Sequence, residues 1–324
     1  MTSPAGGLAS RQRPVPLILD CDPGHDDALA LIVALARPEI DLLAVTTVAG
    51  NAGLDATTRN ALRVLTLVGR TDLPVAAGAA RPLLRPLHVA SDVHGASGLE
   101  GADLPEPAFD PRPEGAVEIM RSVLRAAAEP VTIAAVGPLT NVALLLRTYP
   151  ELAERIAGIR IMGGAIGEGN TTASAEFNIW QDPEAARIVL ECGRPLTLMP
   201  LDVTHQALFG PDEVARLEAL GTRLGSVVAD LLRYFARFHA ERYGWDGSPI
   251  HDAVTVAHLA VPDLVRTIAY RVDVETVSEL TRGRTVVDLH GLTGLPPNVE
   301  VGVAIDRPRF VDLLVNAVAT VGAG

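Results

Sequence analysis

Four carboxylates lie within eight residues near the start of the chain, in the run Asp20-Cys21-Asp22-Pro23-Gly24-His25-Asp26-Asp27. The apolar segment Pro14–Leu19 before this run predicts a buried strand, and Ala28–Ala36 after it is typical of a helix. The acids therefore fall at the carboxyl end of a strand, which is where open α/β sheets bind their ligands. Acidic side chains packed this closely repel one another unless a cation holds them. A hard divalent cation, which prefers oxygen ligands, is the expected partner.

Helix capping alone does not explain this cluster. An Asp at a helix N-terminus satisfies free backbone N–H groups, which would account for Asp26 or Asp27 but not for all four acids. An EF-hand loop does not fit, because Gly24 and His25 occupy its third-ligand and glycine positions. Leu31 also stands where the bidentate Glu of that loop belongs. The run therefore favours a cation site of another kind.

A second short motif, Ile250-His251-Asp252-Ala253, opens another apolar helix. Taken alone, Asp252 is an ordinary N-cap and His251 a surface residue. The functional interpretation makes Asp252 a second, distant metal ligand and His251 a proton donor.

A third pattern combines Gly163-Gly164, Asn170 and Glu176-Phe177-Asn178, ahead of a helix predicted from Pro183. An amide both donates and accepts hydrogen bonds and a carboxylate accepts them, so these side chains suit hydroxyl groups. A polar loop with turn residues is an equally good interpretation of the pattern by itself.

Two loops complete the candidates. His94 lies between glycines in Val93–Leu99, within the long irregular region 78–113, and is either a solvated loop histidine or an imidazole on a mobile loop. The segment Val136–Asn141 is either an ordinary strand-to-helix turn or a turn that directs a backbone carbonyl toward the cation. Five further histidines show no such pattern and are assigned no role: His88, His205, His239, His258 and His290.

The elements that must position these residues alternate along the chain. Apolar runs are followed by helical patterns, which indicates βαβ units in a mostly parallel sheet buried on both faces. The predicted strands are Leu17–Cys21, Leu42–Val48, Val75–Ala77, Val131–Val136, Ile159–Met162 and Leu196–Met199. The predicted helices are Asp27–Ala36, Ala56–Gly69, Gly115–Ala127, Asn141–Arg155 and Pro183–Cys192.

The last third of the chain adds helices and a different kind of strand. A long helical region covers 211–243, a helix starts near Asp252, and a strand at 299–305 and a helix at 310–321 follow later. Residues 267–290 contain alternating segments that suit an antiparallel edge or hairpin. We predict a single α/β domain over residues 14–324, with an open, mostly parallel sheet flanked by helices and a small antiparallel extension. Residues 1–13 are predicted to form a disordered tail.

Composition excludes several classes of function. The 324 residues carry a net charge of −12, and no Arg-rich run is present, so a nucleic-acid partner is not expected. All 27 basic residues are Arg, which removes Schiff-base and P-loop lysines. Two cysteines suit a reducing cytosol rather than a disulfide framework. The apolar run Ala28–Ala36 is too short to span a bilayer, so we expect a cytoplasmic protein without a membrane partner.

These five patterns, in this order, resemble the nucleoside hydrolase family, the inosine/uridine-preferring nucleoside N-ribohydrolases, along essentially the whole chain. The resemblance implies a Rossmann-like nucleoside hydrolase fold, a small-molecule nucleoside substrate and a homo-oligomer, either dimer or tetramer. It also implies a Ca²⁺ site whose protein ligands are Asp22, Asp27, Asp252 and the carbonyl of Val136. Asp20 is expected behind these ligands.

The same resemblance assigns substrate contacts. Asp26 and Asn178 match residues that hold the ribose diol, with Asn51 nearby. Asn170 and Glu176 match contacts to the 5′-hydroxyl. The remaining expected contacts are Met162 under the sugar and Phe177, Tyr243 and Trp245 around the base.

The implied reaction passes through an oxocarbenium-like sugar, which anionic carboxylates stabilise. Asp22 is expected to act as the general base toward water, and His251 as the general acid toward the leaving base. His94 would assist from its loop, whose closure would exclude water. The pair His94 and His251 resembles pyrimidine-preferring or broad-specificity members of the family.

Two alternatives stay open on the residues alone. A haloacid-dehalogenase-like phosphatase would use Asp20 as nucleophile and Asp22 as acid/base. That chemistry requires a Lys or Arg on the phosphoryl group, and this chain has no Lys. Gly24 also replaces the Thr or Val that usually follows Asp-x-Asp-x. A Ca²⁺-dependent nucleoside-binding protein would keep the ribose ligands, but it would tolerate the loss of Asp22 or His251. Both residues are present, which favours catalysis.

Overall fold

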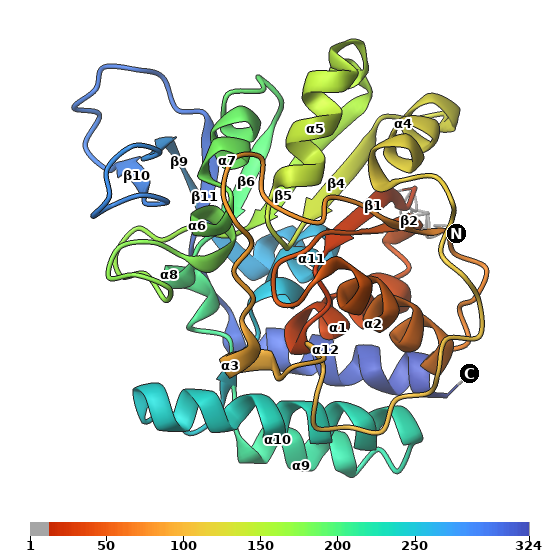
Figure 1. Ribbon diagram of the computed structural model, residues 1–324. Helices are drawn as coiled ribbons and strands as arrows, with labels where there is room; N and C mark the ends of the chain where they lie inside the picture. Colours follow the sequence, from red (N-terminus) through yellow and green to blue (C-terminus); the bar gives the residue numbers. More distant parts are fainter. Residues whose placement is uncertain (1–12, 324) are drawn as a thin grey trace, which may run out of the picture.

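A nine-stranded sheet forms the centre of the computed structural model, which describes residues 13–323 (Figure 1). Its strand order is β10-β9-β11-β6-β5-β4-β1-β2-β3. The strands are β1 (Val15–Cys21), β2 (Ile40–Thr47), β3 (Val75–Ala77), β4 (Val131–Ala135), β5 (Ile156–Met162), β6 (Leu196–Met199), β9 (Val265–Val274), β10 (Thr285–Asp288) and β11 (Val299–Ile305). Strands β7 (Leu208–Phe209) and β8 (Ser248–Pro249) form a separate antiparallel pair. The predicted tail lies outside the described residues except for Arg13.

Helices cover both faces of the sheet. The helices are α1 (His25–Ala36), α2 (Leu54–Leu67), α3 (Ser91–His94), α4 (Ala116–Ala126), α5 (Thr140–Thr148), α6 (Phe177–Gln181), α7 (Pro183–Leu190), α8 (Leu201–Thr204), α9 (Pro211–Glu218), α10 (Arg223–Tyr243), α11 (His251–Ala260) and α12 (Arg307–Gly322), with 3₁₀ turns at Pro150–Arg155 and Pro262–Leu264. None of the helices in residues 13–323 has the length and apolar character that a membrane span requires.

The central strands, such as β1 and β4, are apolar on both sides because both of their faces are buried. On β1, Leu17 and Leu19 pack into one core with α1, α2, α10, α11 and α12, whereas Ile18 packs into a second core with α4, α5 and α7. In Figure 1 the first group of helices lies below the sheet and the second group above it. Alternate residues of one strand therefore anchor two separate helical layers.

The strand order reverses at β1, and this reversal decides where a ligand can bind. From β1 the chain builds β2 and β3 on one side, and β4, β5 and β6 on the other. Asp20 lies in register with Thr46 on β2 and Ala135 on β4. The carboxyl ends of β1 and β4 therefore meet at the topological switch point, and the acidic run begins at this end of β1.

The predicted alternation of strands and helices is confirmed, with two differences. The helix predicted over Asn141–Arg155 ends at Thr148, and a 3₁₀ turn starts at Pro150. The ring of Pro150 disfavours helical backbone at the preceding residue, Tyr149, whose φ and ψ are −130° and 60°. The helical region 211–243 is two helices, because the chain turns at Gly221, where φ is +65°.

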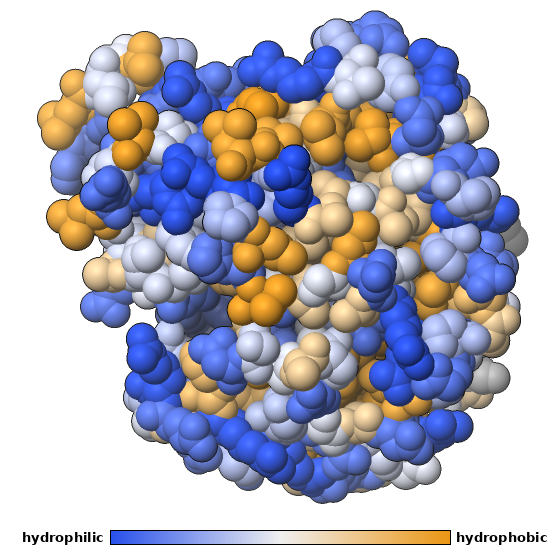
Figure 2. All heavy atoms as spheres, in the orientation of Figure 1, coloured by the Kyte–Doolittle hydropathy of each residue, from blue (hydrophilic) through white to orange (hydrophobic). Residues whose placement is uncertain are grey.

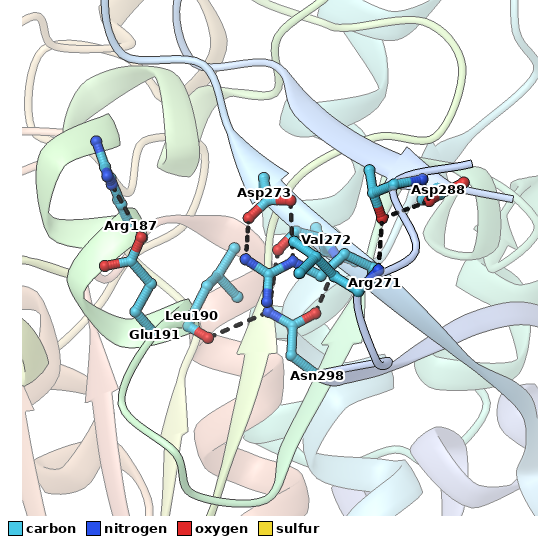
Figure 3. Close-up of polar contacts among 10 residues, drawn as sticks. Arg187, Leu190, Glu191, Arg271, Val272, Asp273, Asp288 and Asn298 are labelled. Atoms are coloured by element: carbon cyan, nitrogen blue, oxygen red, sulfur yellow. Dashed lines mark hydrogen bonds and ion pairs between the residues drawn. The ribbon is translucent and has the colours of Figure 1, made fainter. Parts of the chain in front are cut away.

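The predicted antiparallel extension is confirmed at the end of the sheet. β9 pairs antiparallel with β10 and with β11, whereas β11 pairs in parallel with β6. Asn298 holds this corner together (Figure 3): its Oδ1 accepts the backbone N–H of Val272 at 2.8 Å, and its Nδ2 donates to the carbonyls of Val272 and Leu190 at 3.0 and 3.2 Å. Figure 2 shows apolar side chains exposed at the upper left, in the region of this extension.

Candidate active site

A cavity of about 350 Å³ lies at the carboxyl edge of the sheet. Figure 2 shows the surface hollowed on the left, above α10. Of the residues predicted for the site, those that line the cavity are Asp22, Asp26, Asn51, His94, Val136, Met162, Asn170, Glu176, Phe177, Asn178, Tyr243, His251 and Asp252. Asp27 is buried and does not line the cavity, but its carboxylate accepts the backbone N–H of Asp22, which does. Segments far apart in the chain therefore meet in one space that is large enough for a small molecule.

Three carboxylates meet at the wall of this cavity, and two of them, from Asp26 and Asp252, belong to its lining. Asp26, Asp27 and Asp252 each offer an oxygen, and these oxygens lie within 4.8 Å of one another. Burial raises the pKa of Asp26 to about 7 and raises the pKa of Asp252 well above its usual range. Asp27 and Asp252 are within hydrogen-bond reach, which requires a proton between them unless a cation neutralises both. The α1 and α11 N-termini thus combine into one acidic cluster.

Asp22 adds a free oxygen to this cluster. Its Oδ2 accepts the backbone N–H of Asn51 at 2.7 Å, but its buried Oδ1 has no hydrogen-bond partner within residues 13–323. A Cβ atom at Gly50 or Gly137 would lie 2.1 or 2.4 Å from this carboxylate, so both glycines allow the backbone to approach it. An unpartnered buried carboxylate oxygen is costly, and a cation would remove that cost. The oxygen-only donor set fits Ca²⁺ or Mg²⁺ rather than a softer metal.

Hydrogen bonds from the backbone fix the loop that carries these acids. Oδ1 of Asp27 accepts the N–H of Asp22 at 3.0 Å, and Oδ2 accepts the N–H of Gly24 at 2.9 Å. The side-chain amide of Asn51 donates to Oδ2 of Asp27 at 3.1 Å and to the carbonyl of Asp22 at 3.1 Å. Asp27 and Asn51 therefore hold Asp22 in place.

Asp20, which we expected behind the metal ligands, does not line the cavity. Its Oδ1 accepts hydrogen bonds from Oγ1 of Thr46 at 2.7 Å and from Nδ2 of Asn141 at 2.8 Å. Burial raises the pKa of Asp20 to about 7, against the effect of these two hydrogen bonds. Asn141 also donates to the carbonyl of Thr47 at 3.0 Å, so Asp20 joins β1, β2 and the start of α5.

Three polar residues of the 170–178 segment form the opposite wall. Glu176 caps α6, because its carboxylate accepts the backbone N–H groups of Asn178 at 2.8 Å and Ile179 at 3.1 Å. Nδ2 of Asn178 donates to the carbonyls of Val136 at 2.8 Å and Met162 at 3.2 Å. Oδ1 of Asn170 accepts the N–H of Phe177 at 3.0 Å. Within residues 13–323 the other ends of the two amides, Nδ2 of Asn170 and Oδ1 of Asn178, have no hydrogen-bond partner and are available to a ligand.

Histidines and aromatic rings form the remaining end of the cavity. Nδ1 of His251 lies 2.8 Å from Oγ1 of Thr204, and burial lowers the pKa of His251 well below its usual range. Nδ1 of His239 lies 3.1 Å from the carbonyl of Phe235, which can only accept, so Nδ1 carries the proton and Nε2 is an acceptor. Tyr243 stacks on Trp245 with ring centroids 4.7 Å apart. Trp245, expected at the base, is not among the lining residues.

Sequence reasoning missed part of this wall. His88, His205 and His239, which were assigned no role, all line the cavity, and so do Trp180, Phe235, Phe238 and Arg242. The sequence does contain a pattern that could have predicted the α10 residues. Phe235, His239 and Tyr243 are spaced four residues apart, which places them on one face of a helix. No local pattern marks His88 or His205, which only the folded chain brings to the cavity.

Comparisons with known proteins agree with this geometry. The family model described as inosine-uridine preferring nucleoside hydrolase matches residues 17–312. A pyrimidine-specific ribonucleoside hydrolase RihA from Escherichia coli O139:H28 is 53% identical over 301 residues, which cover 93% of this chain and 97% of that protein. The RihA of Enterobacter sp. (strain 638) is 53% identical over 306 residues, or 94% and 98% of the two chains.

Solved structures give the same answer. A purine-preferring ribonucleoside hydrolase from Gardnerella vaginalis superposes with a TM-score of 0.89 at 31% identity, over 95% of this chain and 99% of that one. A plant nucleoside hydrolase, PpNRh1, superposes with a TM-score of 0.87 at 33% identity, over 94% and 99%. The phosphatase and binding-protein alternatives are thereby excluded. This chain belongs to the inosine-uridine preferring nucleoside hydrolase family and hydrolyses the N-glycosidic bond of ribonucleosides.

Proposed function

We propose that the enzyme is a Ca²⁺-dependent, pyrimidine-preferring or broad-specificity ribonucleoside hydrolase of the cytoplasm. The metal ligands would be Asp22, Asp27, Asp252 and the carbonyl of Val136. The observation that carries this proposal is the unpartnered, buried Oδ1 of Asp22, which lines the same cavity as Asp252 and Val136. The chemistry that Ca²⁺ supplies when bound is polarisation of water and of the sugar hydroxyls.

The ribose would lie over this cluster. Asp26, Asn51 and Asn178 would hold the 2′- and 3′-hydroxyls, and this assignment is supported by the position of all three in the cavity wall. Asn170 and Glu176 would contact the 5′-hydroxyl, although the carboxylate of Glu176 already accepts three backbone N–H groups. Met162 would lie under the sugar ring, as part of the cavity wall where Asn178 contacts its backbone.

The acidic cluster favours the reaction electrostatically. Breaking the N-glycosidic bond leaves positive charge on the sugar, and nearby carboxylates lower the energy of that charge. Asp22 would take the proton of the attacking water as general base. Burial and the neighbouring Asp27 raise the pKa of Asp22 above its usual range, which makes its ionised carboxylate a stronger base than that of an exposed aspartate.

The leaving base would meet the histidine end of the cavity. If Oγ1 of Thr204 donates to Nδ1 of His251, the neutral ring carries its proton on Nε2 and can donate a hydrogen bond from it to the base. Burial lowers the pKa of His251 and favours this neutral ring, so complete proton transfer to the leaving base as general acid would require the imidazolium form, in which Nδ1 also carries a proton. His94 would assist as a second imidazole, with Phe177 and Tyr243 against the base.

Ribose release from inosine, adenosine, guanosine, uridine and cytidine tests this function directly, at neutral pH with Ca²⁺ and without phosphate. We expect release from uridine and cytidine at least as fast as from the purine nucleosides, in line with the RihA relatives, which are named pyrimidine-specific. Strong preference for purine nucleosides would overturn the specificity, and hydrolysis that continues after a strong chelator has removed Ca²⁺ would overturn the metal.

We also propose that the enzyme is a homo-oligomer, a dimer or a tetramer. Its support is the exposed apolar side chains of the antiparallel extension: Val277, Leu280, Leu292 and Leu295. Light scattering at two concentrations would give the mass, and a monomer at both would contradict the proposal. The cytoplasmic location is supported by the two cysteines, Cys21 and Cys192, which are both free.

A further inference from the structure

Glu100 closes the loop that follows His94, and it does so without lining the cavity. Its Oε1 accepts the backbone N–H of Ala96 at 2.8 Å and, more weakly, that of Ser97 at 3.4 Å. Its own backbone N–H donates to the carbonyl of His94 at 3.3 Å. Residues 94–100 therefore form one compact turn, which we call the 94–100 turn, and the carboxylate of Glu100 holds it together.

The second oxygen of the same carboxylate joins this turn to α10. The hydroxyl of Tyr234 donates to Oε2 of Glu100 at 3.1 Å, so each carboxylate oxygen has a different partner. Between the 94–100 turn and α10, both of which lie wholly inside residues 13–323, this is the only hydrogen bond. The contact between the two segments therefore depends on one hydroxyl group.

The backbone is shaped to allow this contact. Gly95 has a φ of +78°, and a Cβ atom there would lie 2.4 Å from Cδ of Glu100. Gly101 has a φ of +106°, and a Cβ atom there would lie 2.4 Å from Cβ of Tyr234. A side chain at either position would displace the carboxylate of Glu100 or the helix that carries Tyr234.

Two residues of the cavity wall lie next to this hydrogen bond. His94 begins the turn, Phe235 follows Tyr234 in α10, and both His94 and Phe235 line the cavity. Their rings stack, with centroids 5.3 Å apart and an interplanar angle of 25°. Aromatic pairs are favourable over centroid separations of about 4.5–7 Å, so stacking alone fixes their spacing only loosely. A hydrogen bond has a narrower range of lengths and angles, and it sets the spacing more closely.

Asn60 of α2 fixes the turn on its other side. Its Nδ2 donates to the carbonyl of Ser97 at 2.8 Å and to the carbonyl of Pro23, within the acidic run, at 3.0 Å. The turn is thus joined to the acidic run through Asn60 and to α10 through Glu100. Loss of the Tyr234 hydroxyl would remove only the second connection, and the acidic cluster would keep its geometry.

We propose that Glu100 and Tyr234 are positioning residues, whose hydrogen bond holds His94 and Phe235 at the spacing that the base of the substrate requires. This inference rests on the proposed function, which places the base at this end of the cavity. Glu100 and Tyr234 do not line the cavity, so they act on the substrate only through the two rings. Their contribution belongs to binding of the base rather than to cleavage of the glycosidic bond.

The hydrogen bond can be tested without any activity. Hydrogen–deuterium exchange measures how often the backbone N–H groups of the 94–100 turn open. In Tyr234→Phe, which keeps the ring, we expect this exchange to be about fivefold faster than in wild type, the effect of one lost hydrogen bond. Unchanged exchange overturns the inference.

Tyr149→Phe is the matched control for this measurement. It removes a tyrosine hydroxyl that hydrogen-bonds to a glutamate, Glu118, in a part of the chain that does not line the cavity. Exchange in the 94–100 turn should therefore equal that of wild type. Equally fast exchange of the turn in both variants would mean that the effect is not specific to Tyr234, and it would contradict the inference.

The kinetic consequence is a higher KM with little change in kcat. In Tyr234→Phe, we expect KM for uridine to rise about fivefold while kcat stays within twofold of wild type. Inhibition by free ribose, which has no base, should be unchanged because the acidic cluster keeps its geometry. An unchanged KM, a kcat that falls as much as KM rises, or weaker inhibition by ribose contradicts the inference.

Two variants of Glu100 separate the hydrogen bond from the charge. Glu100→Gln keeps an oxygen that accepts the N–H of Ala96 and gains an amide that can donate to the hydroxyl of Tyr234, so its KM for uridine should be close to that of wild type. Glu100→Ala loses both contacts, and its KM should rise at least as much as in Tyr234→Phe. If Glu100→Gln behaves like Glu100→Ala, the negative charge is what matters, and the inference is overturned.

Failure of the proposed function would look different. A wild-type enzyme that releases no ribose from uridine or cytidine would overturn the pyrimidine specificity. Exchange in the 94–100 turn would still report whether Tyr234 holds Glu100, because that measurement needs no substrate.

Discussion

Asn51 holds one oxygen of Asp22 and leaves the other free. Its backbone N–H donates to Oδ2 of Asp22 at 2.7 Å, while Oδ1 of Asp22 has no hydrogen-bond partner within residues 13–323. The same Asn51 donates through its side-chain amide to Asp27, the neighbouring acid. One loop residue thus orients two carboxylates, and it decides which oxygen of Asp22 can meet a cation or a water.

Asp22→Asn should lower kcat for uridine by about 10²–10⁴, because an amide cannot take a proton from water. The amide oxygen can still accept the N–H of Asn51, so the fold should persist, as circular dichroism and the melting temperature would show. Asp110→Asn, at an exposed acid away from the cavity, is the matched control. Unchanged turnover in Asp22→Asn would remove Asp22 as the general base.

His251→Ala should slow the release of poor leaving groups most. Uridine hydrolysis should fall by about 10²–10³, because the departing base loses its proton donor. Hydrolysis of p-nitrophenyl riboside, whose leaving group needs no proton, should be nearly unchanged. His290→Ala, at an exposed histidine, controls for the substitution itself. Equal losses on the two substrates would show that His251 does not act on the leaving group.

The fold was predictable where local pattern and packing agree. Short apolar runs such as Leu17–Cys21 are buried on both faces. The sequence therefore predicts both that the run is a strand and that helices cover the two faces of its sheet. The break at Pro150 was readable locally, because proline disfavours helix at the residue before it. The positions of His205 and His239 were not, because they depend on how α8 and α10 close over the sheet. The contact between His25 and His94, 69 residues apart, is likewise a product of tertiary structure alone.

Removal of Ca²⁺ with a strong chelator should abolish hydrolysis and lower the melting temperature. Without a cation, Asp22 and Asp252 are buried acids whose pKa values lie well above the ordinary range. Such groups stabilise the fold when protonated, and this contribution is lost as pH rises through their folded pKa values. The difference in melting temperature between loaded and stripped enzyme should therefore be larger at pH 8 than at pH 5. Return of Ca²⁺ should restore both properties, whereas no thermal shift at either pH would contradict a bound cation.

The carboxyl group of Glu176 should contribute to the pH dependence of the free energy of unfolding. Burial raises the pKa of Glu176 to about 7 from its ordinary value of 4.5, against the hydrogen bonds from Asn178, Gly164 and Ile179. An acid with a raised folded pKa gives a contribution that is complete below pH 4.5 and is lost as pH rises through about 7. In Glu176→Gln this loss is absent.

The stability of Glu176→Gln relative to wild type should therefore increase between pH 4.5 and pH 8, by up to about 3 kcal/mol. Urea unfolding of the Ca²⁺-saturated proteins at several pH values would measure this difference. Glu114→Gln, at an exposed glutamate, should show no such trend. A pH-independent difference between Glu176→Gln and wild type would mean that Glu176 stays ionised in the folded enzyme. In that case its three backbone N–H donors outweigh its burial, and the carboxylate would meet the 5′-hydroxyl as an anion.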